Sequence, residues 1–138
     1  MNTFFNKKNR IDDSQFLSKV ASLLIHAAKI DEAYTDDEKE IIRKTLIKLG
    51  AEKLNVDKLM SKAALNEDNS NQILDFTREV KKASDTDKTK VIEALWEIIY
   101  SNKNADIYEA SLMRRLTGLL YIDNKIVGDI KEKIKNKI

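Results

Sequence analysis

A run of carboxylates is the most prominent group of side chains with chemical potential in this sequence. Residues 31–40 carry six acidic side chains against the single Lys39, a local net charge of −5. Hard divalent cations prefer several oxygen ligands, so cation binding is the chemistry that such a run could support. The structural alternative is that the acids form the solvated start of a helix.

Other reactive groups are scarce. The chain has no Cys and one His, which excludes thiolate nucleophiles, thiolate metal sites and clusters of imidazole ligands. No nucleophile, base and orienting group occur together, so the sequence favours a non-enzymatic protein. A metal-dependent, hydrolase-like enzyme that uses loop carboxylates is the alternative.

The elements that must position these groups are helices. The 138 residues include no Pro and three Gly, so the strongest helix breakers are nearly absent. Apolar residues recur at helical spacing in seven segments, with starts near residues 13–14, 35, 56, 71, 84–86, 106 and 123. We therefore predict an all-α single domain over residues 14–138, preceded by a basic segment at residues 1–13.

The sequence predicts where several helices begin and end. Thr35 followed by Glu38 predicts a capping box, and Gly50 suits the left-handed residue that ends the same helix. Residues 66–70 are expected to connect the third and fourth helices. Apolar periodicity also places Leu74 and Ile126 on the buried faces of their helices.

The sequence contains an internal repeat. Residues 20–49 align without gaps on residues 91–120, at an offset of 71. Glu38 falls on Glu109 and Arg43 on Arg114, and the two arginines are expected each to hold a carboxylate. The pattern predicts a duplicated helix-loop-helix unit with pseudo-twofold symmetry.

The second repeat carries specific motifs. It reads Leu-Trp-Glu-Ile-Ile-Tyr100, then Asp-Ile-Tyr-Glu109, then Leu-Met-Arg-Arg-Leu-Thr-Gly-Leu-Leu120. The first repeat contains Leu-Leu-Ile-His-Ala-Ala-Lys-Ile-Asp31, followed by the capping box. Both resemble the TerB family, named for tellurite resistance, over roughly residues 16–130. The resemblance implies a seven-helix TerB-like bundle, a role in a stress response, and metal binding through loop acids.

Two departures from the TerB pattern bear on the implied metal site. Glu32 replaces the Gly of the first loop, and the second loop has Asn102 and Lys103 where the family has Asp-Gly-Glu. An amide in place of a carboxylate and an added ammonium both weaken cation binding, so the resemblance leaves a weak site in the first loop only. The cation is a divalent ion of unspecified identity, and no cofactor is required.

The residues that would form this weak site are His26, Asp31 and Glu38. Each also has a structural interpretation. His26 could be a packed helix residue, Asp31 a turn residue and Glu38 a helix cap.

The distribution of charge along the chain indicates which classes of partner the protein could bind. Residues 1–10 and 125–138 each carry +3, and the body between them carries −4. The aromatic and basic residues at 4–10 predict a weak membrane-surface contact. Nucleic acid is not expected, because the total charge is only +2. With no signal peptide or membrane span in the sequence, we expect a cytoplasmic adaptor that binds protein partners.

Overall fold

Helices account for the regular structure of this protein. The computed structural model describes residues 2–29, 34–69, 73–101 and 107–137, which contain seven helices and no strand. The all-α prediction is therefore confirmed. The helices are α1 (Asn2–Ala28), α2 (Asp36–Lys48), α3 (Val56–Asn69), α4 (Ile73–Val80), α5 (Asp85–Ser101), α6 (Ile107–Leu119) and α7 (Asn124–Lys137).

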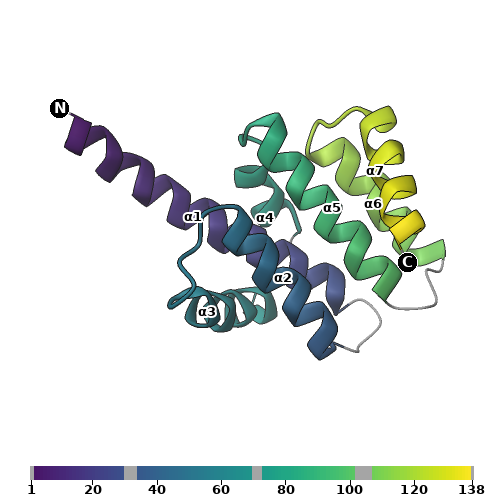
Figure 1. Cartoon of the computed structure of the whole chain (residues 1–138), viewed down its shortest axis with the longest axis horizontal. Helices are drawn as coiled ribbons and strands as arrows, with labels where there is room; N and C mark the ends of the chain where they lie inside the picture. The colour runs from purple at the N-terminus through teal and green to yellow at the C-terminus, as the bar shows by residue number, and fades with distance from the viewer. Residues whose placement is uncertain (1, 30–33, 70–72, 102–106, 138) are drawn as a thin grey trace.

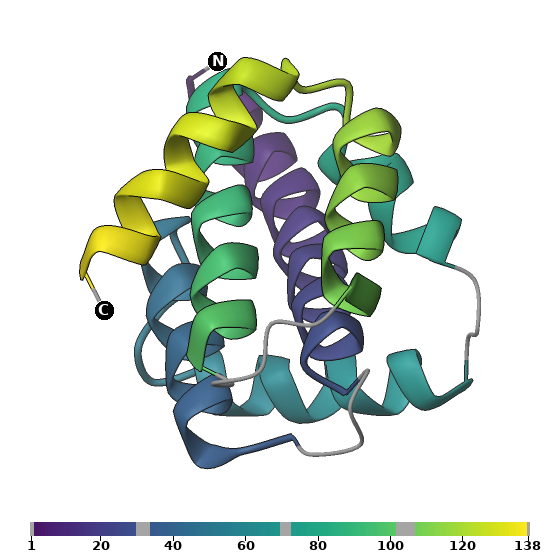
Figure 2. The same cartoon turned by 90° about the vertical axis from the view of Figure 1, so that its right-hand side faces the viewer.

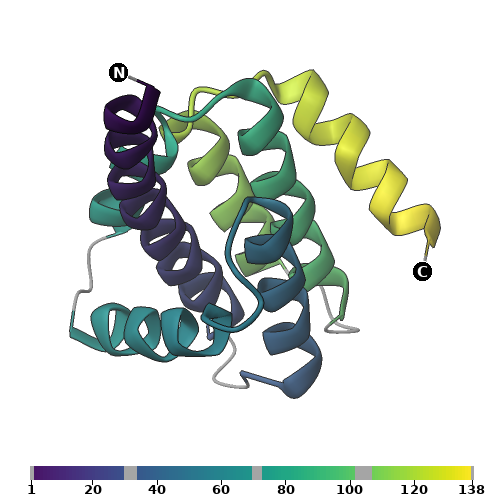
Figure 3. The same cartoon turned by 60° about the vertical axis from the view of Figure 1, so that its left-hand side comes forward.

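Two helices, α1 and α5, form the centre of the bundle (Figures 1 and 2). α1 packs against α3 and α4, α5 packs against α2 and α7, and α6 contacts α4. Figure 3 shows α3 lying across the end of α1 that is far from the N-terminus. The fully buried residues of the two central helices include Val20, Leu23, Leu24, Val91, Ile92 and Leu95. Each of the other five helices adds buried side chains to the same core.

The first helix is longer than predicted. It begins at Asn2 instead of near residue 13 or 14, and its N-terminal turns project beyond the other helices in Figure 1. Residues 2–13 contain neither Pro nor Gly, so nothing in their backbone chemistry stops the helix from continuing towards the N-terminus.

α2 and α6 end in the same way. Adding 71 to the bounds of α2 gives those of α6. Gly50 has a φ of +115° and its N–H donates to Ile47 O, at 3.0 Å, while Tyr121 has a φ of +54° and its N–H donates to Gly118 O, at 3.3 Å. The next residue in each case donates back to the helix as well, which completes a Schellman motif. The predicted cap at Gly50 is confirmed, and pseudo-twofold symmetry stays a prediction.

Two apolar residues expected to be buried lie at the surface. Leu74 is 49% exposed and Ile126 is 45% exposed. The buried residues of α4 form a single stripe at helical spacing along the helix, and Leu74 lies outside this stripe. The stripe consists of Ile73, Phe76, Thr77 and Val80.

Candidate functional site

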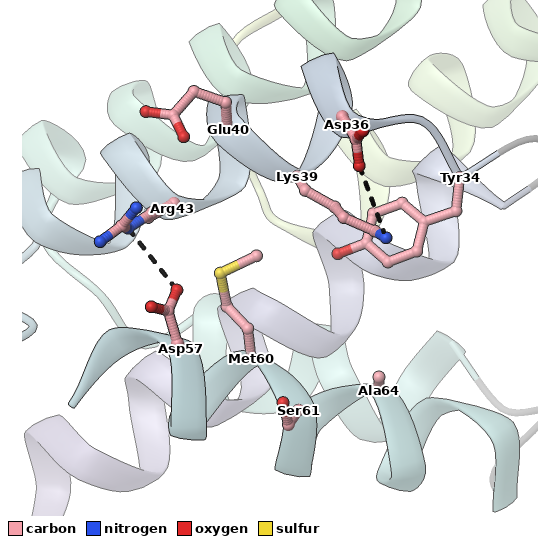
Figure 4. Close-up of a pocket in the computed structure, with 9 residues that line it drawn as sticks. All are labelled: Tyr34, Asp36, Lys39, Glu40, Arg43, Asp57, Met60, Ser61 and Ala64. Atoms are coloured by element: carbon pink, nitrogen blue, oxygen red, sulfur yellow. Dashed lines mark ion pairs between the residues drawn. The ribbon is translucent and has the colours of Figure 1, made fainter.

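A groove of about 560 Å³ lies between α2 and α3 (Figure 4). Each helix contributes four residues with the spacing i, i+3, i+4, i+7, which places them on one face. Tyr34, just before α2, closes one end of the groove. The helical residues are Asp36, Lys39, Glu40 and Arg43 from α2, and Asp57, Met60, Ser61 and Ala64 from α3.

Charges of opposite sign pair across and along this groove. The Arg43 Nε lies 3.6 Å from Asp57 Oδ1, so one ion pair joins the two helices. The Lys39 Nζ lies 3.9 Å from Asp36 Oδ1 and 5.1 Å from the centre of the Tyr34 ring. Arg43 therefore holds a carboxylate, as predicted from the repeat, whereas Arg114 forms no ion pair within the part of the chain that the structure describes. The groove can offer both charge signs to a partner.

The surroundings of Tyr34 change the pKa of its phenol. Burial, reinforced by the carboxylate of Glu38 and partly offset by Lys29, raises the pKa of Tyr34 to about 12. The phenol is therefore a neutral hydrogen-bonding group at physiological pH, positioned where the groove meets the start of α2.

Glu38 caps the start of α2. Its side-chain Oε1 accepts hydrogen bonds from the backbone N–H of Thr35, at 2.8 Å, and from the Thr35 hydroxyl, at 3.0 Å. The Thr35 Oγ1 in turn accepts from the Glu38 backbone N–H, at 3.2 Å. Glu38 is 2% exposed. The predicted capping box is confirmed, and it occupies one oxygen of the carboxylate.

His26 is joined to α3. Its Nδ1 lies 3.3 Å from Glu67 Oε1, and the other oxygen of Glu67 accepts from Lys29 Nζ, at 2.8 Å. The Phe76 ring lies against the imidazole, with the two ring centres 6.3 Å apart. A hydrogen bond from Nδ1–H to Glu67 leaves Nε2 as the nitrogen that could face a cation.

Comparison with known families gives a match over almost the whole chain. The family model of Tellurite resistance protein TerB matches residues 17–132 of the 138. The chain belongs to the TerB family. Searches of curated proteins and of solved structures return no match.

The cation ligands implied by the TerB resemblance have different surroundings in the structure. Glu38 is held in its capping box and His26 is paired with Glu67. Asp31, the third predicted ligand, lies outside the described residues. Within the described ranges no three His, Asp or Glu side chains are close enough together to hold a metal ion. The predicted set of His26, Asp31 and Glu38 stays a prediction.

Sequence reasoning missed several residues of this TerB domain that the structure brings together. Glu67 was expected in the connection at residues 66–70, but α3 continues to Asn69 and carries it to His26. Asp57 and Ser61 were not singled out. Their spacing with Met60 and Ala64 indicates that the four residues share one helix face. Spacing alone does not indicate which other helix this face packs against.

No helix in the described part of this TerB domain is both long and apolar enough to cross a membrane.

Proposed function

We propose that this TerB-family chain is a non-enzymatic, cytoplasmic binding module that serves as an adaptor in a stress response, tellurite stress included. The groove between α2 and α3 is its main surface for a protein partner. The observation that carries the proposal is the lining of this groove, where paired charges of both signs lie beside Tyr34 and Met60. Protein interfaces commonly combine aromatic, Met and Arg side chains in this way.

The capping role of Glu38 supports a binding module over a metal-dependent hydrolase. Glu38 already accepts two hydrogen bonds from Thr35 through one oxygen, which makes this carboxylate a weaker base and a poorer ligand than a free one. The Arg43–Asp57 ion pair, at 3.6 Å, links α2 to α3, and the buried Arg43 Nε makes no hydrogen bond within the part of the chain that the structure describes, so it can still donate one to a partner.

The experiment that tests the proposal is site-specific photocrosslinking in cells. A photoreactive amino acid replaces Ser61, which is exposed in the groove, and in a matched control it replaces Lys125, which is exposed on α7. We expect a discrete crosslinked protein from position 61 under tellurite stress and none from position 125. The Arg43→Glu variant should remove it. Equal crosslinking from both positions, or none from either, would contradict the proposal.

A weak divalent-cation site in the first acidic loop is the second part of the proposal. Its support is the charge of residues 31–40, now reduced by the commitment of Glu38 to its cap. Calcium, magnesium, manganese and zinc are titrated while backbone amide shifts are followed by NMR. Shifts confined to residues 26–40 and lost in Asp31→Asn support the site. Equal shifts near residues 102–109 would contradict it.

A further inference from the structure

A second cleft lies on another part of the molecule, between α4 and α6. Its volume is about 210 Å³, and its walls include Leu74 and Arg78 of α4 with Leu119 of α6. Lys81, directly after α4, and Tyr121, two residues after the end of α6, form its rim. These helices take no part in the α2–α3 groove, so the cleft is a separate site.

The charge of this cleft has one sign. Among the residues that the structure describes, the charged side chains that line it are those of Arg78 and Lys81, and both are cations. Within the part of the chain that the structure describes, neither cation forms an ion pair with a carboxylate. The α2–α3 groove, in contrast, pairs its cations with its own acids. The α4–α6 cleft is therefore complementary to an anionic ligand that brings its own carboxylates.

Apolar surface lies beside the two cations. Leu74 is 49% exposed and Tyr121 is 75% exposed, and both line the cleft. Gly118 also lines it, and a Cβ placed on Gly118 would meet nothing within 4 Å. An open apolar space thus lies within reach of Arg78, and it suits one apolar side chain of a ligand.

Tyr121 adds an independent observation. Its φ of +54° is left-handed, a conformation that costs an ordinary L-residue energy and that Gly adopts freely. The equivalent position in the first repeat is Gly50. Burial does not compensate for the strain, because the side chain is mostly exposed; the Lys81 Nζ lies over its ring, 5.0 Å from the centre. The Schellman motif accounts for the left-handed conformation, but Gly would serve that cap as well as Tyr does. The aromatic side chain adds exposed apolar surface at the rim of the cleft, where a ligand can contact it.

We propose that the α4–α6 cleft binds an acidic peptide segment of a partner protein. An apolar side chain of the peptide sits over Gly118, between Leu74 and Tyr121, and a neighbouring carboxylate pairs with Arg78 and Lys81. This site goes beyond the function proposed above, since it uses other helices and a ligand of defined charge.

Two variants separate binding from folding. Gly118→Leu fills the apolar space, and since Gly118 is helical with open space above it, the substitution should leave the bundle intact. Gly128→Leu is the matched control, because Gly128 is also helical, exposed and open, but lies on α7. Arg78→Gln removes a cation from the exposed surface of α4.

The probe is a displayed library of random octapeptides, selected against the wild-type chain. We expect enriched peptides to combine Asp or Glu with a neighbouring large apolar residue. A synthetic enriched peptide should then shift amide signals of α4 and α6. Its affinity should fall by about tenfold or more in Arg78→Gln, which loses a charged hydrogen bond, and similarly in Gly118→Leu. In Gly128→Leu it should stay within about twofold, the usual range for a neutral surface change.

Several outcomes would overturn the assignment. These are no enrichment, enriched peptides without acidic residues, full affinity in Gly118→Leu, or amide shifts in α2 and α3 instead. Binding to phosphatidylglycerol vesicles that Gly118→Leu abolishes, without peptide binding, would assign the cleft to lipid headgroups and also overturn it. Failure here leaves the crosslinking test of the α2–α3 groove unaffected, because the two experiments probe different helices.

Discussion

Replacing Glu38 tests whether this carboxylate is primarily a structural group. In Glu38→Ala the two hydrogen bonds that Oε1 accepts from Thr35 are lost, and they measure 2.8 and 3.0 Å in the folded protein. Glu38 is 2% exposed, so the remaining cavity is poorly solvated. Loss of a helix cap costs about 1 kcal/mol, and a hydrogen bond to a charged group about 1.5–3 kcal/mol. Since these terms overlap, we expect a loss of about 2 kcal/mol in the free energy of unfolding.

Urea denaturation followed by circular dichroism measures this loss. With a slope of about 1.5–2 kcal/mol per M, the unfolding midpoint should fall by roughly 1 M. Glu38→Gln keeps an acceptor oxygen in the capping box and should lose about half as much or less. Asp37→Ala is the matched control, because it removes an exposed carboxylate from the same helical turn. The capping argument is refuted if Glu38→Ala lowers the midpoint no more than Asp37→Ala does.

Three further predictions concern strain, ionisation and helix propensity. Tyr121→Gly should raise the free energy of unfolding by about 0.5–1 kcal/mol and should also weaken peptide binding. Gly50→Ala should lower the free energy of unfolding by about 1–2 kcal/mol. Urea denaturation measures both changes, and a Tyr121→Gly variant less stable than wild type would contradict the strain argument. The pKa of Tyr34, raised to about 12, predicts a contribution to stability that is complete below about pH 10 and is lost as the pH rises towards 12. The unfolding midpoint should therefore fall more steeply between these pH values in wild type than in Tyr34→Phe, and equal slopes would refute it. Gly118→Ala and Gly128→Ala should each raise the free energy of unfolding by about 0.5–1 kcal/mol, because both positions are helical with room for a Cβ. A lower free energy of unfolding in either variant would contradict this prediction.

Features set by neighbouring residues could be predicted from the sequence. The cap formed by Thr35 and Glu38 and the turn at Gly50 depend on contacts within a few residues, so the local pattern was sufficient. The stacking of Trp96 on Tyr100, with ring centres 5.9 Å apart, follows from their spacing on one helix. The family motifs also lie within single helices and their adjoining loops.

Features that depend on packing between helices could not be predicted. Glu67 reaches His26 across 41 positions of sequence, and their contact depends on how α3 crosses α1. Leu74 has the residue type of the core but lies beside the stripe that faces α1. Both the α2–α3 groove and the α4–α6 cleft are formed by pairs of helices. Periodicity within one helix indicates which residues share a face, but it does not indicate which second helix lies opposite that face.

α2 and α6 share one backbone arrangement at their ends but present different surface chemistry. α2 and α6 have equivalent bounds and end in the same Schellman motif, but the left-handed position is Gly50 in one and Tyr121 in the other. Stability alone favours Gly at both positions. The strained Tyr121 lies in the cleft whose cations have no carboxylate partner among the described residues, whereas the α2–α3 groove pairs its own charges. Two surfaces of different charge character, on different helices around one core, would let the protein hold two partners at once. The adaptor role that we propose requires two such surfaces, one for each partner.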